Sequence, residues 1–314
     1  MRHTVKNNIL RQFSRPFVFL TFFLSGFLFV TGCTKQNLQY KAATGLLSIY
    51  LDWGTTPPQD ILFYLYPQGK EGNVTGGPFV YECNSREFRQ TLPPGDYKIL
   101  LCTANALGVS YEGMDNLATA RVCAVKRDEN GCIEQPSNVF SANTCHHSDI
   151  LHISVSDTLV TGITPVSLTK AVTFKFGIKN FPSLTGVSGI LKGVVSAVNL
   201  FNGTQEATPC SHMFETGFKE GNYIATVHIF DLITKQEKTP VENSNVLALK
   251  LEGANGKNYN VTLDISKTIH DIKQANNGII PASVSIFLEL ALVDGNIRAS
   301  VSRWTNGSGS GSVN

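Results

Sequence analysis

The residue with the clearest chemistry is Cys33, because an export-signal pattern leads directly into it. An apolar run from Pro16 to Val30 follows a segment with four basic and no acidic residues, and small residues Thr31-Gly32 precede the cysteine. This order of charge, apolar run and small residues is typical of a bacterial lipoprotein signal. We therefore expect residues 1–32 to be removed and the thiol of Cys33 to carry the lipid. The basic residues are Arg2, Lys6, Arg11 and Arg15.

Attachment to a membrane is expected to rest on that lipid alone. The apolar run of roughly 15 residues is shorter than the ~20 that a membrane-spanning helix needs. Later segments are short apolar runs interrupted by Gly, Pro, Asn and charged residues. A single acyl chain binds a membrane only marginally, whereas several chains on one cysteine anchor it stably.

Removal of the signal changes the charge of the chain. The sequence holds 26 Lys and Arg against 24 Asp and Glu, and the four basic residues of the signal leave 22 against 24, a net charge of −2. The apparent basic character therefore belongs to the discarded segment. A mature chain with this balance gives no indication of nucleic-acid binding.

The six other cysteines lie outside the cytosol after export, where disulfides form. Six cysteines permit 15 pairings, and the sequence does not choose among them. Cys123, Cys132 and the Cys145-His146-His147 cluster have ligand types suited to zinc but lack a paired C-x-x-C motif. We expect no metal and no cofactor there, and interpret the group as free buried thiols or as a disulfide between neighbouring strands. The six are Cys83, Cys102, Cys123, Cys132, Cys145 and Cys210.

The sequence contains no nucleophile elbow, phosphate-binding glycine loop, dinucleotide fingerprint, two-histidine metal helix or calcium loop. We expect no enzymatic activity and no catalytic residue. Trp53 and Trp304 each end a strand, where an indole either stacks on a sugar or fills the core. Asp157-Thr158-Leu159 fits a short O-glycosylation pattern, which makes Thr158 a candidate modification site in an accessible segment.

Short period-2 apolar segments recur along the body, bounded by Gly, Pro, Asn and Asp, which is typical of an all-β protein. The spacing predicts two β-sandwich domains in series, residues 45–157 and 158–305, with a boundary in the polar stretch 157–164. A polar tether, 33–44, precedes them, and a flexible Gly/Ser tail, 306–314, follows. The expected strands are 45–53, 61–66, 79–83, 87–92, 97–102, 120–126, 132–134, 150–155, 166–178, 223–230, 246–252, 258–265, 284–294 and 299–304.

Three local signals refine this prediction. Pro93-Pro94-Gly95-Asp96 predicts a hairpin turn, and Asp128-Glu129-Asn130-Gly131 and Gly253-Ala254-Asn255-Gly256 predict two more. Residues 266–275 predict a helix with Ser266 as its cap and with Ile269 and Ile272 on its buried face. His152 is expected on the solvent face of a strand.

These features together resemble the fimbrillin-associated anchor lipoproteins of Bacteroidales. The resemblance rests on the lipobox, which is the end of the lipoprotein signal at Val30-Thr31-Gly32-Cys33, and on Asp52-Trp53 at the end of the first strand. It also rests on Phe63-Tyr64-Leu65-Tyr66-Pro67 and the Leu92 to Tyr97 turn. The second half adds Leu168-Thr169-Lys170-Ala171-Val172, the stretch from Leu191 to Asn202, and the strand from Tyr259 to Ile265. The resemblance covers nearly the whole mature chain.

The resemblance implies two transthyretin-like sandwiches and a lipid-anchored place on the cell outer membrane, exposed at the surface. The expected partners are fimbrial structural or accessory subunits, held by addition of a β-strand to an exposed edge or groove. The family brings no catalytic residues. A surface glycan- or ligand-binding lipoprotein of similar fold is the alternative, with Trp53 or Trp304 as its aromatic platform.

Overall fold

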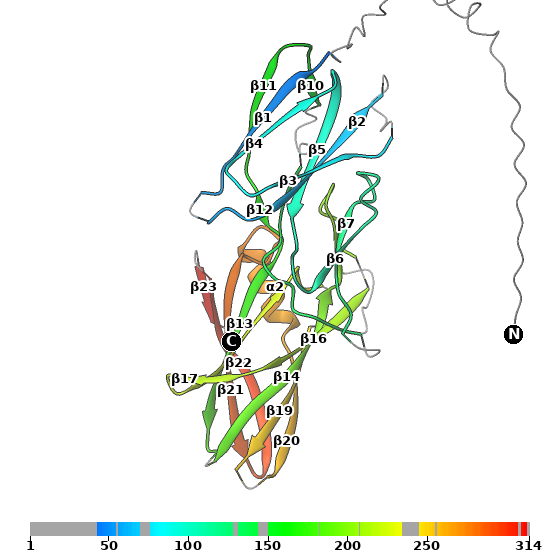
Figure 1. The fold of residues 1–314 in the computed structure, drawn as a ribbon. Coiled ribbons are helices and arrows are strands. Elements are labelled where there is room, and N and C mark those ends of the chain that lie inside the picture. Colours follow the sequence, from blue (N-terminus) through cyan, green and yellow to red (C-terminus); the bar gives the residue numbers. More distant parts are fainter. Residues whose placement is uncertain are drawn as a thin grey trace, which may run out of the picture. The chain divides into compact units, whose positions relative to one another are not determined.

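The computed structural model describes residues 43–54, 56–69, 76–127, 131–143, 150–181, 183–206, 208–233, 245–254, 256–306 and 309–312. Cys33, the predicted tether up to residue 42 and the Cys145-His146-His147 cluster lie outside these residues. Within the described part no helix is long and apolar enough to cross a membrane. The all-β fold class is confirmed, because strands in five sheets form nearly all of the regular structure (Figure 1).

The first half of the body is a sandwich of two sheets. Sheet A has the order β11-β1-β4, and sheet B has the order β12-β9-β5-β2-β3 with β10 also paired to β5. The strands are β1 (Gly45–Leu51), β2 (Ile61–Gln68), β3 (Phe79–Cys83), β4 (Glu87–Leu92), β5 (Gly95–Thr103), β9 (Phe140–Asn143), β10 (Leu151–Ile153), β11 (Thr158–Ile163) and β12 (Val166–Ser167).

The alternation of apolar residues along these strands builds the first core. In β1 the side chains of Leu47, Ile49 and Leu51 are fully buried, while Tyr50 between them is exposed, as the two-residue period of a strand requires. Phe63 of sheet B stacks on Phe88 of sheet A at 4.1 Å between ring centroids. The two sheets are therefore held face to face by direct aromatic and aliphatic contact.

The second half is another sandwich, made of sheets D and E. Sheet D has the order β20-β19-β14-β16-β8, and sheet E the order β17-β18-β13-β21-β22-β23. The strands are β8 (Cys132–Ile133), β13 (Lys170–Lys179), β14 (Leu184–Val195), β16 (Pro209–Glu215), β17 (Gly217–Lys219), β18 (Asn222–Ile229), β19 (Val246–Gly253), β20 (Asn258–Asp264), β21 (Ser283–Val293), β22 (Asn296–Asn306) and β23 (Gly309–Ser312).

The second core reaches beyond its own sandwich. Phe174 and Phe176 of β13 stack with Phe214 of β16 between sheets D and E. The same cluster of buried residues continues to Tyr66 and Leu100, which lie on the face of sheet B turned away from the first core. Sheet B is thus buried on both faces, and this explains the long run of buried residues in β5.

A small fifth sheet contributes to the same core. Sheet C has the order β15-β7-β6 and is built from β6 (Val109–Glu112), β7 (Arg121–Ala124) and β15 (Ala197–Asn199). Two of its strands come from the first half of the sequence and one from the second. The chain from residue 43 onward accordingly forms one compact unit.

The helix was predicted with its correct bounds but the wrong cap. The helix α2 spans Ser266–Ala275, and Ile269 and Ile272 are buried as expected. The carboxylate of Asp264 accepts the backbone N–H of Ser266 at 2.8 Å, whereas the buried hydroxyl of Ser266 has no hydrogen-bond partner. The helix begins at Ser266, so Ile265 is the cap residue and the Ser266 hydroxyl lies in the first turn instead of capping it.

Three expectations about strand connections need correction. Residues 158–163, predicted as a polar boundary, form β11 and pair in parallel with β1, so they complete the first sandwich. The turn Pro93-Pro94-Gly95 does not close a hairpin, because β4 pairs with β1 in sheet A and β5 pairs with β2 in sheet B. Gly309–Ser312 of the expected flexible tail pairs with β22, since backbone hydrogen bonds need no side chain.

Gly189 provides a test of the packing between sheet D and its core. A Cβ at this position would lie 2.7 Å from the Phe214 ring and 2.9 Å from the Ala248 carbonyl oxygen. Gly189→Ala should therefore destabilise the fold by roughly 1–3 kcal/mol through overpacking. Urea unfolding measures this. Gly217→Ala is the matched control, because nothing lies within 4 Å of its Cβ; equal midpoints for the two variants would contradict the packing.

Candidate functional site

The junction between the halves is formed by backbone hydrogen bonds. β7 pairs antiparallel with β15, placing Cys123 opposite Ala197, and β8 pairs in parallel with β16. The N–H of Leu200 donates to the Ala120 carbonyl at 2.8 Å, which extends the first pairing. Strands from both halves of the sequence therefore share two sheets.

Side chains add to this junction. The Asn143 amide at the end of β9 donates to the carbonyls of Leu200 and Phe201 at 2.6 and 3.1 Å. In the other direction, the Asn199 amide donates to the Ala118 carbonyl at 2.8 Å. Amide side chains thus tie the loops of each half to the backbone of the other.

A buried ion pair fixes the segment that presents β15. Lys273 of α2 lies 2.9 Å from the Asp231 carboxylate, and both side chains are at most 10% exposed. The second carboxylate oxygen accepts the Gln205 amide at 2.7 Å, and the Asp231 carbonyl accepts the N–H of Val195 at 3.0 Å. Val195 and Gln205 flank β15, so this network holds the strand in place for β7. Breaking one partner of such a pair is strongly destabilising.

His212 of β16 is buried where β16 pairs with β8. Its Nδ1 lies 3.3 Å from the Ile133 carbonyl oxygen, and its Nε2 lies 3.3 Å from Oε1 of Gln135, whose amide nitrogen reaches His228 at 3.0 Å. Burial lowers the pKa of His212, and the positive charge of Arg127 and the nearby His228 act in the same direction. The junction therefore contains a group that resists protonation.

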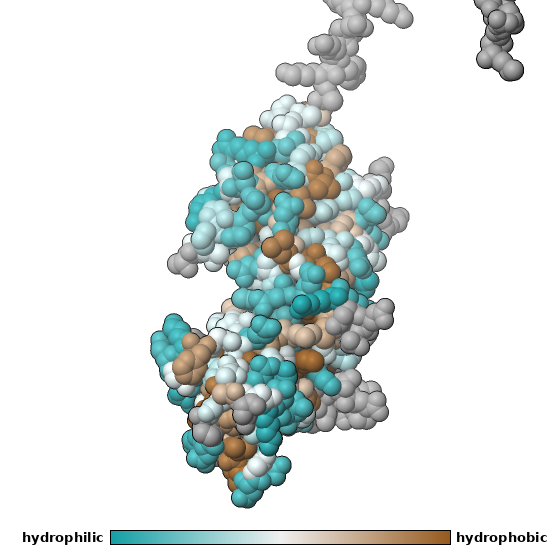
Figure 2. All heavy atoms as spheres, turned by 60° about the horizontal axis from the view of Figure 1, so that its bottom comes forward, coloured by the Kyte–Doolittle hydropathy of each residue, from teal (hydrophilic) through white to brown (hydrophobic). Residues whose placement is uncertain are grey.

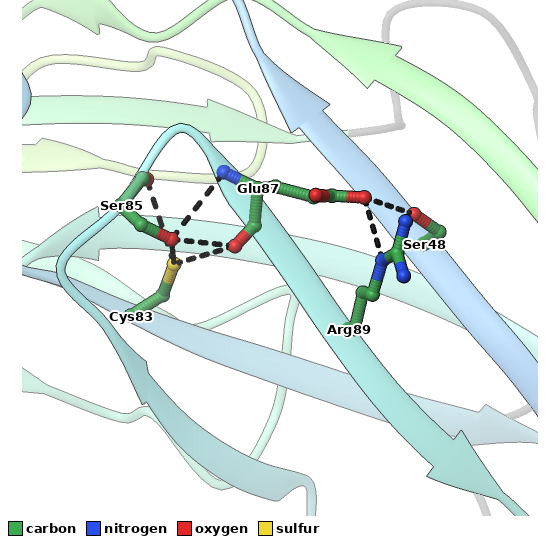
Figure 3. A network of polar contacts seen from close by, with 5 residues as sticks. All are labelled: Ser48, Cys83, Ser85, Glu87 and Arg89. Atoms are coloured by element: carbon green, nitrogen blue, oxygen red, sulfur yellow. Dashed lines mark hydrogen bonds and ion pairs between the residues drawn. The ribbon is translucent and has the colours of Figure 1, made fainter.

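The outer face of sheet A carries a compact polar network (Figure 3). The carboxylate of Glu87 accepts from Nε of Arg89 at 2.6 Å and from the Ser48 hydroxyl at 3.2 Å. Cys83 and Ser85 continue the contacts around the Glu87 backbone. The hydrogen bond from Arg89 holds the pKa of the Glu87 carboxyl below its usual range. This network fixes β4 against β1 on the solvent side.

The opposite edge of sheet A is formed by β11. In the described part of the chain β11 pairs only with β1. Val160 is 69% exposed on the outer face, while Leu159 and Ile163 are half-buried against the margin of the first core. Sheet A thus ends in a strand whose free edge lies beside an incompletely covered core.

Two of the pockets in the described part of the chain lie elsewhere. One of about 620 Å³ lies over sheet D, with Ile190, Met213 and Ala248 among its lining residues, together with Glu215 and Lys250. Another of about 580 Å³ lies beside sheet C, next to the bidentate pair of Arg121 with Glu112. Within the described residues no three His, Cys, Asp or Glu side chains are grouped to hold a metal ion.

The structure separates the predicted site residues. Thr158 is exposed as the first residue of β11, and His152 is exposed on β10, as expected of a strand's solvent face. Cys33 lies outside the described residues, so its lipidation stays a prediction, as does glycosylation of Thr158. Cys83, Cys102, Cys123 and Cys210 carry free thiols.

The two tryptophans are not available for sugar stacking. Trp53 is 4% exposed and packs edge-on against Phe140 in the first core, with an indole nitrogen that has no partner. Trp304 is 5% exposed and belongs to the second core. Both indoles therefore fill the core, which was one of the two possibilities at these strand ends. The aromatic platform expected for a glycan is absent at these positions.

A family model described as a domain of unknown function, DUF5119, matches residues 32–215. The chain belongs to the DUF5119 family. No curated protein matches the chain. The match begins beside Cys33 and ends with β16, so it contains both strand pairs that join the halves.

Solved structures share the fold at low identity. A candidate adhesin from Bacteroides ovatus is 18% identical with a TM-score of 0.57, covering 77% of this chain and 89% of that one. The fimbrial anchor protein Mfa2 of Porphyromonas gingivalis is 12% identical with a TM-score of 0.53, covering 84% and 98%. A candidate polysaccharide-binding protein from Bacteroides thetaiotaomicron is 10% identical with a TM-score of 0.54, covering 86% and 98%. The predicted resemblance to fimbrial anchor proteins is confirmed at the level of the fold.

The pairing at the junction and the outer strand β11 were missed from the sequence. Strands were predicted at 120–126 and 132–134, where β7 and β8 lie, but without their partners in the second half. β15 has three residues, too few for a period-2 pattern to identify. In β11 the residues Leu159, Thr161 and Ile163 alternate with Thr158, Val160 and Gly162, and this alternation was the available signal. Because Asp157 and Thr158 are polar and Gly162 is small, the alternation was weak and the segment was interpreted as a boundary.

The pH dependence of stability tests the buried histidine. Because the folded-state pKa of His212 is lowered, the unfolded chain binds the proton first as the pH falls below about 6.5, and stability is lost there. His212→Asn keeps a donor for the Ile133 carbonyl but does not titrate. We expect the urea midpoint of the variant to fall less between pH 7 and pH 5 than that of the wild type; identical losses would contradict the buried neutral state.

Proposed function

We propose that this protein is a cell-surface lipoprotein of a fimbria, an anchor or accessory subunit that joins fimbrial subunits to the outer membrane. Acyl chains on Cys33 hold it at the membrane, and the body binds a subunit by strand addition. The fold shared with the fimbrial anchor Mfa2 over 84% of this chain and 98% of that one supports this role. The resemblance of the lipobox and strand motifs to anchor lipoproteins supports it independently.

The observation that carries the proposal is the interlocking of the halves. An anchor must keep its folded body intact while the fibre pulls against the lipid attachment. Two sandwiches joined by a loose linker would leave the outer face of sheet B poorly covered, because inter-domain interfaces in a chain are normally weak. Here β7·β15 and β8·β16 place hydrogen-bonded strands across that point, and one apolar core continues through it. This arrangement suits a load-bearing subunit.

The surface composition fits binding through the backbone rather than through a large apolar face. In the space-filling view apolar side chains form small patches among hydrophilic ones (Figure 2). A broad apolar interface would show as a larger contiguous patch. Strand addition needs little apolar surface, because main-chain hydrogen bonds supply affinity and alternate side chains supply register. The mode of binding therefore agrees with the visible face of the molecule.

A non-enzymatic role agrees with the environment of the charged residues and thiols. Several of the described charged side chains engage in structural contacts, such as Glu87 with Arg89 and Asp231 with Lys273. Burial raises the pKa of the Cys210 thiol to about 12 and of the Cys123 thiol to about 11. Neither sulfur is activated as a nucleophile, since nucleophilic cysteines have lowered pKa values.

Replacement of the lipidated residue tests the proposal. Cys33→Ala should move the protein from the membrane fraction to the soluble fraction and release attached fibres with it, because one thiol carries the whole attachment. Fractionation of cells labelled with an alkyne fatty acid measures both effects. Cys83→Ala is the matched control and should stay lipidated and membrane-bound. A Cys33→Ala protein that keeps its label and its fibres at the wild-type level would refute the anchor role.

A further inference from the structure

The free edge of β11 is unusual among the outer strands of this protein. Within the described residues four outer strands have five residues or more, namely β3, β4, β11 and β20. β3 contains Glu82, β4 contains Glu87 and Arg89, and β20 ends in Asp264, whereas β11 has neither a charged residue nor a proline. Natural proteins protect edges with charges, prolines or bulges, because an open edge pairs with other chains. β11 has no such protection.

The main chain of β11 offers a regular set of unused donors and acceptors. The N–H of Leu46 donates to the Asp157 carbonyl and the N–H of Asp52 donates to the Ile163 carbonyl, so the odd-numbered residues face β1. Because successive peptide groups of a strand point to opposite edges, Val160 and Gly162 direct their N–H and C=O groups away from β1. The N–H of Thr158 already binds the Asp157 carboxylate at 2.8 Å. A docking strand would therefore form its backbone hydrogen bonds with Val160 and Gly162.

The side chains beside the edge of β11 are also suited to an incoming β-strand. Leu159 and Ile163 point toward the first core but are only half-buried, so an added strand would cover both. On the outer face Val160 is 69% exposed and Tyr50 is 53% exposed, next to the polar network of Glu87 and Arg89. A strand with apolar side chains two residues apart on its inner face would complete the sandwich.

From these observations we propose that β11 is the docking edge for an extended β-strand of a fimbrial subunit. The incoming strand pairs with Val160 and Gly162 and places apolar side chains over Leu159 and Ile163. This inference rests on the proposed function and specifies its binding site. It places the docked subunit on the first half, the half nearer in sequence to Cys33. The hydrogen bonds of the junction then lie outside the docking interface.

A proline at position 160 isolates the docking interaction. Proline lacks an N–H, and it is tolerated at an edge position whose N–H faces away from the ladder. Val160→Pro should therefore keep the β1–β11 pairing and remove a donor from the docking edge, while Val160→Thr keeps the donor and the branched shape. Circular dichroism and tryptophan fluorescence of both full-length variants verify folding before binding is compared.

The experiment uses lipidated, tagged full chains in intact cells, with a photo-crosslinking residue at Val160 or, as control, at the exposed Met213 of sheet D. We expect a covalent adduct with a fimbrillin-like subunit from position 160 and none from position 213. We also expect Val160→Pro to lower recovery of that subunit by about tenfold, or about 1.4 kcal/mol, with Val160→Thr at the wild-type level.

These outcomes distinguish a failure of the β11 docking edge from a failure of the proposed function. Fimbrial subunits crosslinked from position 213 alone, or full recovery with a folded Val160→Pro, would overturn the docking edge and leave the anchor role intact. Adducts between two copies of this chain at position 160 would make β11 a self-association edge instead. Absence of fimbrial subunits from every pull-down, the wild type included, would defeat the proposed function itself.

Discussion

Backbone pairing between the two halves is the interaction on which the rest of the structure depends. β7 and β8 come from a segment that leaves sheet B, covers its outer face and then bonds to β15 and β16 of the second half. The core of the second sandwich consequently continues beneath sheet B. Without these strands Tyr66 and Leu100 would lose their cover, and the buried His212 would lose the Ile133 carbonyl.

The polar side chains at the junction support this backbone pairing and do not replace it. Asp231 and Lys273 hold the segments flanking β15, while Asn143 and Asn199 bind carbonyls across the junction. Buried polar networks of this kind are costly when incomplete, so they specify one arrangement of the halves. In the described part of the chain this arrangement leaves β11 as the uncharged outer strand of sheet A, opposite β4 with its Glu87 and Arg89.

Much of the fold could be predicted from the sequence where the pattern was long. The β-favouring residues of β1, the alternation in β13 and the isoleucine spacing of α2 identified those elements, because each element buries one face or stripe. The pairing of β8 with β16 could not be predicted, since two residues carry no period. The burial of Trp53 and Trp304 depends on the facing sheets, which local sequence does not describe. Cys33 was recognisable because its signal is a linear motif.

The most direct test of this account uses the two tryptophans as one reporter in each core. Trp53→Phe leaves an indole only in the second core, and Trp304→Phe leaves one only in the first. Urea unfolding of the two variants, followed by fluorescence and checked by circular dichroism, measures whether the halves unfold together. If the junction makes one cooperative body, the fluorescence and dichroism transitions of each variant coincide. Two separate transitions, one for each core, would contradict the account.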